Sequence, residues 1–489
     1  MIRKLVNSKS FLVSFLLIVI SIVMPILSLE PNDYWWHYKA GEYIVQNKTI
    51  PFIDVFSWYG IENNLYWSSH EWLSEVVYYL VGRFTGNFGV IAFVTLCLMA
   101  LFFILYKGNK KEYEKNLGFT LIWSIVGFTS FIYLISPRPH MISFIFFALT
   151  VYLLYEYRNN ENSKKIWLLP LISLLWVNFH GGSSNLPYIL TIIFIITGLF
   201  EFKFSNITFD KISKKQIKTY FIVGALSFLV LVLNPHGLSM ISYPYVNMND
   251  TVMLNLIGEW RSPDIKNFTD IVFVLPIVIA VLVFFKSKKE ILFIDLVLIG
   301  AFSYLSLKSI RFVAFMYIVS SFILFRYLDE EKLINFKFKN AIDLNKYSFY
   351  ILKRLYLILI GIISVFLILI IPTNPIGDRF NSDIIDKEII ETIKKENPQK
   401  LFSHYNYGGY LIYNDIKPLI DGRADMYSGT LLKDYTNFTK NLDDKLLEKY
   451  DFDYYLIPKD TLIDNYIQSN LDEFEKLIEK DKCILYKKK

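Results

Sequence analysis

The sequence has little charge and very little cysteine for its length. Only 20% of its 489 residues are charged, whereas a soluble domain usually has about 25%. The two cysteines, Cys97 in an apolar run and Cys483 near the end, form neither a metal motif nor a disulfide framework. The sequence also has no P-loop, dinucleotide-binding fingerprint, zinc motif or GlyXSerXGly elbow. The soluble enzyme classes identified by those motifs are therefore excluded.

Hydrophobic residues are abundant and are grouped in long runs. They make up 54% of the chain, and the mean hydropathy is +0.36. Many runs are long enough to cross a bilayer core that is about 30 Å thick. This pattern excludes a soluble enzyme, a disordered protein and a fibrous protein, and it predicts an α-helical polytopic membrane protein.

The apolar runs predict about eleven transmembrane helices. The first run lacks a small-residue cleavage site, so we interpret it as an uncleaved helix and not as a signal peptide. Residues 72–84 are interpreted as an amphipathic helix at the membrane interface. The predicted spans are 11–28, 87–106, 117–135, 140–157, 166–177, 186–202, 217–233, 270–285, 291–305, 310–327 and 351–372. Asp295 lies inside one of them, where we expect it to make a polar contact between helices.

The basic residues predict the orientation in the membrane. With the N-terminus in the cytoplasm, the cytoplasmic segments carry 25 Lys and Arg residues and the external loops carry 8. The net charge of +6 is the sum of +10 in residues 1–372 and −4 in residues 373–489. The positive charge thus marks topology, and no nucleic-acid-binding module is recognisable. Eleven spans place the C-terminal residues outside the cytoplasm.

Two domains are predicted. Residues 1–372 form the transmembrane domain, which includes an external loop, 29–86, with amphipathic helices. Residues 373–489 form a small extracytoplasmic α/β domain. Its β-like runs are 401–413, 418–427 and 453–458, and its helical stretches lie near 383–396 and 462–480.

Acidic residues and histidines in loop 29–86 are interleaved with tryptophans. Asp33, His37, Asp54, His70 and Glu71 are surrounded in sequence by five tryptophans, and Trp260 comes from a later loop. Sugars stack their C–H faces on aromatic rings and offer hydroxyls to carboxylates, so this composition suits a carbohydrate site. An aromatic belt that anchors the loop at the membrane interface explains the tryptophans equally well.

Basic side chains lie at the predicted external helix ends. They are Arg138, His140, His180, His236, Lys308 and Arg311. Together they could hold the phosphate of a lipid headgroup. Each of them could instead snorkel to the interface or cap its own helix.

Several segments resemble a prokaryotic family of polytopic membrane glycosyltransferases with GT-C architecture. These segments are 33–42 (DYWWHYKAGE), 50–57 (IPFIDVFS), 70–75 (HEWLSE), 234–237 (NPHG) and 421–427 (DGRADMY). The resemblance implies transfer of a sugar, with inversion, at the outer face of the cytoplasmic membrane. The implied donor is a polyprenyl-phosphate-linked sugar, and the acceptor is a hydroxyl of a glycan, lipid or protein of the cell envelope.

The resemblance also implies roles for individual residues. Asp33 is the expected general base and Glu71 the expected second acid. The expected donor-phosphate ligands are Arg138, His140, His236 and Arg311. The expected sugar or acceptor contacts are Trp35, Trp36, His37, His70, Trp72 and Glu259. No metal-ligand set and no cofactor are assigned. Because Asp33 has no adjacent acidic partner, the sequence does not decide whether a divalent ion, Mg²⁺ or Mn²⁺, is used.

Two other functions remain open at this point. A transporter or flippase for a lipid-linked glycan would also need many helices and basic groups, but it should show repeats and polar pairs near the bilayer midplane. A non-catalytic envelope-glycan assembly protein would instead use the C-terminal domain. In that case Asp421, Arg423 and Asp425 would be a glycan-contact loop, whereas they could equally form a salt-bridged turn.

Overall fold

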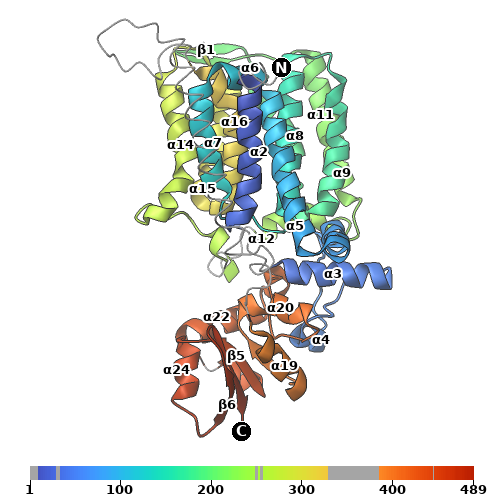
Figure 1. Ribbon diagram of the computed structural model, residues 1–489. Helices are drawn as coiled ribbons and strands as arrows, with labels where there is room; N and C mark the ends of the chain where they lie inside the picture. Colours follow the sequence, from blue (N-terminus) through green and yellow to red (C-terminus); the bar gives the residue numbers. More distant parts are fainter. Residues whose placement is uncertain (1–8, 29–32, 248–251, 254–256, 329–384, 444) are drawn as a thin grey trace, which may run out of the picture.

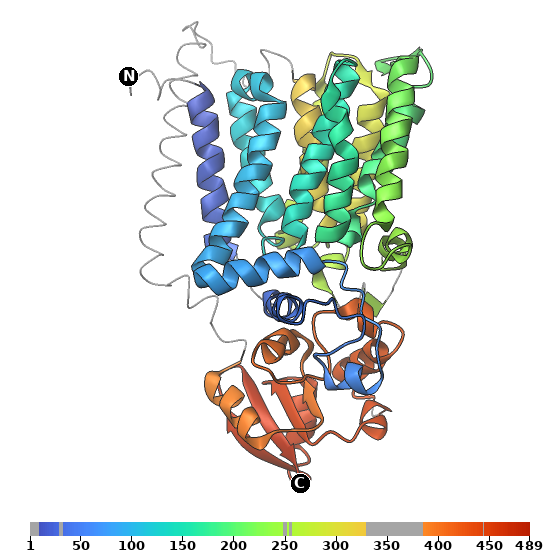
Figure 2. The same ribbon diagram turned by 90° about the vertical axis from the view of Figure 1, so that its right-hand side faces the viewer.

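The computed structural model describes residues 9–28, 33–247, 252–253, 257–328, 385–443 and 445–489. Long helices stand side by side in one bundle, and a small α/β domain lies against one end of it (Figures 1 and 2). The predicted fold class, a helical membrane part followed by a small α/β domain, is confirmed. The predicted boundary between residues 372 and 373 and the predicted span 351–372 lie outside the described residues.

Each predicted span within the described residues contains a helix. The bundle consists of α2 (Lys9–Ser28), α5 (Trp72–Gly108), α7 (Leu117–Phe131), α8 (His140–Asn159), α9 (Leu169–Phe179), α10 (Leu186–Thr197), α11 (Lys214–Leu229), α14 (Phe268–Lys286), α15 (Phe293–Lys308) and α16 (Val313–Ile323). Six helical segments of the described chain are long and apolar enough to cross a membrane, and two more are apolar but shorter. The helices therefore have the length and composition of a multi-pass membrane protein.

Helix α5 contains both the predicted interfacial helix and the span that follows it. The two halves meet at Gly86, whose φ of 63° and ψ of −164° interrupt the helical backbone. Residues with a side chain rarely adopt this conformation, so glycine permits the bend. The first half lies across the end of the bundle, and the second half rises into it (Figure 2). The separation predicted between 72–84 and 87–106 is thus a sharp kink.

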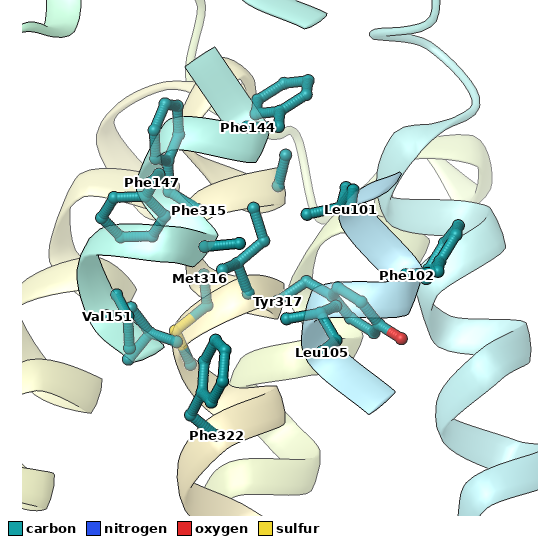
Figure 3. Packing of buried hydrophobic residues seen from close by; sticks show 14 of the residues in the cluster. Leu101, Phe102, Leu105, Phe144, Phe147, Val151, Phe315, Met316, Tyr317 and Phe322 are labelled. Carbon is teal, nitrogen blue, oxygen red and sulfur yellow. The ribbon is translucent and has the colours of Figure 1, made fainter. Parts of the chain in front are cut away.

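The centre of the bundle is formed where α5, α8 and α16 meet (Figure 3). All eleven residues of α16 are buried, which makes it the central helix. Leu101 and Leu105 of α5, Phe147 of α8 and Met316 of α16 are each at most 1% exposed. Because lipid tails are as apolar as these side chains, close packing and hydrogen bonds must hold such helices together.

Hydrogen bonds and an ion pair between side chains also hold the helices together. Trp123 of α7 donates through Nε1 to Ser321 Oγ of α16 at 2.8 Å. The fully buried Asp295 of α15 accepts hydrogen bonds from the hydroxyls of Tyr155 and Tyr327, the latter at 2.6 Å, and pairs with Arg326. The predicted role of Asp295 as a helix-packing contact is confirmed.

The two ends of the bundle carry different structures. One end holds α6 (Lys110–Lys115) and a small sheet of β1 (Phe202–Phe204), β2 (Ile207–Phe209) and β3 (Ile291–Leu292). The opposite end holds α3 (Tyr34–Asn47), α4 (Trp58–Glu62), α12 (Ser239–Asn247) and the C-terminal domain (Figure 1). This is the alternation of loops that the spans predict, with loop 33–86 and the C-terminal domain on the same side.

The C-terminal domain is built on a four-stranded sheet of order β4-β5-β7-β6. Strand β4 (Leu401–Ser403) runs parallel to β5 (Tyr454–Pro458), and β7 (Cys483–Lys488) is antiparallel to both β5 and β6 (Phe474–Glu479). Its helices are α19 (Lys387–Glu396), α20 (Gly408–Tyr413), α21 (Ala424–Tyr427), α22 (Leu431–Asn441), α23 (Lys445–Lys449) and α24 (Leu462–Gln468).

Parts of the predicted pattern in this domain are wrong. The run 401–413 forms a short strand and then helix α20, whose first residue, Gly408, lies directly against the carbonyl of Ile420, where a Cβ would come within 2.2 Å. The run 418–427 is a loop that leads into α21. The stretch 462–480 is helical only to Gln468 and then forms β6, because pairing with β7 overrides its local preference.

Candidate functional site

A cavity of about 1100 Å³ lies at the end of the bundle that faces the C-terminal domain. Nine of the predicted site residues line it: Asp33, Trp36, His37, His70, Glu71, Arg138, His140, Glu259 and Arg311. Most of these side chains lie at or near a helix end, before α3, α5, α8 and α16, so the bundle brings distant segments to one level. The C-terminal domain adds Tyr405, Asn406 and residues 422–425 to the lining.

Asp33 is held by an arginine that it shares with a second carboxylate. Arg138 Nη1 donates to Asp33 Oδ2 at 2.8 Å, and Nη2 donates to Glu259. Arg138 Nε donates to Ser136 Oγ at 2.7 Å. Burial raises the pKa of Glu259, but the Arg138 guanidinium outweighs burial and holds that pKa below its usual value. Arg138 is therefore occupied by protein carboxylates.

The C-terminal domain contacts Asp33 through a glycine. A Cβ at Gly422 would lie 2.4 Å from Asp33 Oδ1 and 2.7 Å from Trp36 Nε1. The hydroxyl of Tyr405 donates to the Gly422 carbonyl at 3.3 Å. Trp36 Nε1 is buried without a hydrogen-bond partner among the described residues. The backbone at Gly422 thus approaches Asp33 more closely than any other residue type would allow.

Glu71 is surrounded by imidazoles. Its Oε1 lies 3.1 Å from His70 Nε2 and 3.2 Å from His180 Nε2, and its Oε2 lies 3.6 Å from His37 Nε2. Burial raises the pKa of Glu71, but the neighbouring histidines together lower it well below its usual value. Burial lowers the pKa of His70, whereas the carboxylates of Glu71 and Asp425 raise it, and the net shift is upward.

His180 is a site residue that the sequence indicates only as one of several basic groups at helix ends. In the structure it is 3% exposed, lines the cavity and contacts Glu71 directly. Its Nδ1 lies 2.6 Å from Ser143 Oγ, and Arg311 Nη2 donates to its Nε2 at 3.3 Å. Burial lowers the pKa of His180 well below its usual value.

Arg311 is the basic side chain of the cavity that is least engaged with protein carboxylates. Besides the contact to His180, its guanidinium lies over the ring of Trp260, 5.3 Å from the ring centroid. No ion pair between Arg311 and a carboxylate is found within the part of the chain that the structure describes. A guanidinium in this position keeps hydrogen-bond donors for a ligand in the cavity.

Four predicted residues have other partners. His140 lines the cavity but uses Nε2 to donate to the Leu134 carbonyl at 2.5 Å. His236, which does not line the cavity, pairs through Nδ1 with the Tyr66 hydroxyl at 2.9 Å. Trp35 packs on Tyr410 and Tyr413, and Trp72 donates to Asn178 Oδ1 at 3.0 Å; neither lines the cavity.

Asp425 and Tyr243 were not predicted as parts of one site. The Tyr243 hydroxyl donates to Asp425 Oδ2 at 2.8 Å and lies 3.4 Å from His70 Nε2. Both residues line the cavity. Burial raises the pKa of Asp425. The C-terminal domain therefore contributes a carboxylate next to the Glu71 cluster.

The two neighbouring residues, Asp421 and Arg423, form the salt-bridged turn that was one of the two predictions for this segment. Arg423 is 2% exposed and binds Asp421 through Nε and Nη2 at 2.8 and 2.6 Å. Its Nη1 donates to Asp54 Oδ1 at 2.7 Å, and its guanidinium lies 4.6 Å from the ring centroid of Trp67. This Arg423 cluster, formed by Asp54, Asp421 and Arg423, joins the C-terminal domain to the first loop.

The remaining wall of the cavity is apolar and belongs to the helices. Its side chains come from α8, α10, α14, α15 and α16 and the turns beside them. They include Leu134, Phe144, Leu186, Ile189, Leu190, Ile193, Phe273, Phe302, Leu305, Phe312 and Phe315. A ligand in this cavity would meet charged groups at one side and hydrocarbon at the other.

No family model matches the sequence, and no curated protein matches it. Among solved structures, the chain is similar to the crystal structure of an oligosaccharyltransferase of Archaeoglobus fulgidus tethered to an acceptor peptide. The two chains are 12% identical, the match covers 92% of this chain and 69% of that chain, and the TM-score is 0.49. At these values the likeness assigns neither a residue nor an activity to this protein.

Proposed function

We propose that this protein is a membrane glycosyltransferase of the GT-C type. It takes a sugar from a polyprenyl-phosphate donor and transfers it, with inversion, to an acceptor hydroxyl at the outer face of the cell membrane. The observation that carries this proposal is the cavity itself. One cavity combines the carboxylate of Asp33, the guanidinium of Arg311 and an apolar wall of helix side chains.

Asp33 is the general base in this proposal. Its Oδ2 is bound by Arg138, while its Oδ1 faces the Gly422 backbone at the cavity surface. Arg138 fixes the rotamer of the Asp33 carboxylate, whose oxygens can accept a proton. A positioned carboxylate typically contributes about 10²–10⁴-fold in rate.

Arg311 is the proposed ligand of the donor phosphate. Arg138 is bound by two carboxylates, His140 donates to a main-chain carbonyl, and His236 lies away from the cavity. Of the four residues expected to bind phosphate, Arg311 thus has the most donor capacity left. Its fork of N–H groups matches phosphate oxygens.

The apolar wall is the proposed place of the carrier chain next to the phosphate. Phe302, Phe312 and Phe315 line it, together with the aliphatic residues named above. A prenyl chain placed there remains in a hydrocarbon environment while its phosphate reaches the polar end of the cavity. This arrangement favours a lipid-linked donor over a soluble nucleotide sugar.

The proposed reaction needs one displacement. The acceptor oxygen loses its proton to Asp33 and forms a bond to the anomeric carbon, while the bond from that carbon to the phosphate oxygen breaks. The electron pair of that bond leaves with the polyprenyl phosphate, whose charge Arg311 stabilises. Attack from the face opposite the phosphate inverts the configuration.

The test is a transfer assay in membranes with a panel of polyprenyl-phosphate sugars. We expect Asp33→Asn to lower transfer by at least about 10²-fold without changing membrane insertion. Asp415→Asn is the matched control, because Asp415 is 77% exposed and pairs with Lys39 away from the cavity. Full transfer by the Asp33 variant would refute the proposed base, and no transfer by the unmodified protein from any donor would refute the function.

A further inference from the structure

The Glu71 cluster has the spacing of a metal site. One ligand atom each from His70, Glu71 and His180 lies within 4.8 Å of the other two. The two distances from the imidazole Nε2 atoms to Glu71 Oε1, 3.1 and 3.2 Å, are those between neighbouring ligands of one ion. Ligands at about 2.0–2.1 Å from a tetrahedral ion lie roughly 3.4 Å apart.

The hydrogen-bond partners fix the orientation of His180. Arg311 can only donate, so His180 Nε2 must accept its hydrogen bond and carries a lone pair. The proton of the neutral ring is therefore on Nδ1, which faces the Ser143 hydroxyl at 2.6 Å. A metal-binding histidine is typically held in this way, by a partner at the ring nitrogen that does not bind the ion.

His70 is oriented in the same manner. Its Nδ1 lies 3.1 Å from the Ser68 carbonyl, which can only accept, so Nδ1 is the donor. In the neutral ring, Nε2 then presents its lone pair to Glu71 Oε1. With both rings neutral, two nitrogen lone pairs and a carboxylate oxygen face one another, and a cation between them would remove their mutual repulsion.

A further histidine supports the same centre. His37 is 1% exposed, and its Nε2 lies 3.6 Å from Glu71 Oε2. Its Nδ1 has no hydrogen-bond partner among the described residues, although Glu75 Oε1 lies 3.8 Å away. Among the described residues, His37 thus adds a buried imidazole beside Glu71, and its other ring nitrogen faces Glu75.

We propose that His70 Nε2, Glu71 Oε1 and His180 Nε2 bind a divalent transition metal of the Zn²⁺ class. Two imidazoles and one carboxylate are one of the known ligand sets of catalytic zinc, whereas Mg²⁺ prefers oxygen ligands throughout. The residues border the cavity, and three protein ligands leave a coordination position for an oxygen of a bound molecule. This site does not depend on the proposed glycosyl transfer.

Arg311 lowers the affinity of this site for the metal ion. Its guanidinium donates to the His180 nitrogen that would bind the metal, so the two cations compete for one lone pair. Removal of the guanidinium by Arg311→Gln should therefore strengthen metal binding. A simple loss of structure would weaken it, which makes this variant a sensitive control.

The experiment measures metal binding directly. The full-length protein is purified without a polyhistidine tag, treated with a chelator, and dialysed against Zn²⁺ for elemental analysis. We expect one Zn²⁺ per chain and a weaker affinity in His180→Gln, by more than the roughly 10–100-fold that loss of an outer partner costs. His236→Gln is the matched control, because it removes an imidazole that does not line the cavity.

Two results would overturn the site. One is an unmodified protein that binds no Zn²⁺ above the level of the Glu71→Gln variant. The other is an affinity that His180→Gln leaves unchanged. Both results are independent of transfer activity, so failure of the metal site and failure of the proposed function are distinguishable.

Discussion

Replacement of Arg423 by methionine tests the attachment of the C-terminal domain. Arg423 binds Asp421 within its own domain and Asp54 of the first loop, and both carboxylates are at most 2% exposed. Methionine keeps an unbranched side chain of similar length but removes the positive charge. The variant leaves two buried carboxylates without their counter-ion at the junction of the two domains.

The buried contacts of Arg423 determine how much its loss should weaken docking of the C-terminal domain. Removal of one partner from a buried ion pair costs about 3–5 kcal/mol. Part of the loss is offset, because Asp54 still accepts a hydrogen bond from the Ser57 amide at 3.1 Å and Asp421 one from the Tyr427 hydroxyl at 2.6 Å. We therefore expect the lower end, about 3 kcal/mol, which is roughly a 100-fold shift in the docking equilibrium.

Native-state proteolysis of the solubilised protein measures this shift. When opening is fast relative to cleavage, the cleavage rate follows the population of the open form, so it should rise about 100-fold. Lys400→Met is the control at the same junction. Lys400 lies 4.0 Å from Glu62 and both side chains are at least 36% exposed, so its loss should change docking by less than about 1 kcal/mol.

A double variant separates the electrostatic contribution of Arg423 from its packing contribution. If the penalty comes from uncompensated buried charge, Asp54→Asn should relieve part of the effect of Arg423→Met, because one carboxylate is removed. The double variant should then be cleaved more slowly than Arg423→Met alone. Equal or faster cleavage of the double variant would show that the arginine acts through packing, for example on Trp67, and would refute the electrostatic argument.

Two further predictions concern the cavity and pH. Gly422→Val should abolish most transfer without loss of expression, because its Cβ would come within 2.4 Å of Asp33 Oδ1, whereas Gly300→Ala, with no described atom within 4 Å of its Cβ, should be silent in the same assay. Burial raises the pKa of Asp54, but Arg423 and its hydrogen bonds bring the pKa below the usual 3.8. The folded state thus binds this proton less well than the unfolded chain, so its stabilisation is present above that pH and lost below it. Thermal melts should show the difference between the unmodified protein and Asp54→Asn as constant from pH 8 to 5 and shrinking below pH 4; a difference that grows on acidification would contradict the assignment.

The helical part could be predicted from the sequence because each span carries its own signal. Apolar runs and the positions of basic residues gave the helices and their alternation, and Gly86 marks the kink between two segments that already differ in composition. The short helices α9 and α10 are harder to count as spans, since they have only 11 and 12 residues and a proline is the second residue of each.

The site could be predicted only in part because its partners are distant in sequence. Loop 29–86 is predictable because it concentrates acids, histidines and tryptophans in one segment. The contact between Glu71 and His180 spans more than 100 residues, and that between Asp54 and Arg423 spans 369. A local sequence pattern carries no information on such pairs. For the same reason, His236 and Trp72 are predicted as site residues although neither lines the cavity.

The domain contacts change how the assembly-protein hypothesis must be tested. Deletion of the C-terminal domain would uncover the cavity and the buried Trp58, whose Nε1 donates to the Leu401 carbonyl at 3.1 Å, so lost transfer would not separate a catalytic from a structural role. Asp425→Asn does separate them. The amide oxygen can still accept the hydrogen bond from Tyr243, so docking and thermal stability should be unchanged. A cavity carboxylate that binds a sugar hydroxyl contributes about 1.5–3 kcal/mol, so we expect kcat/KM to fall roughly 10- to 100-fold. Unchanged kcat/KM would limit the domain to covering the site.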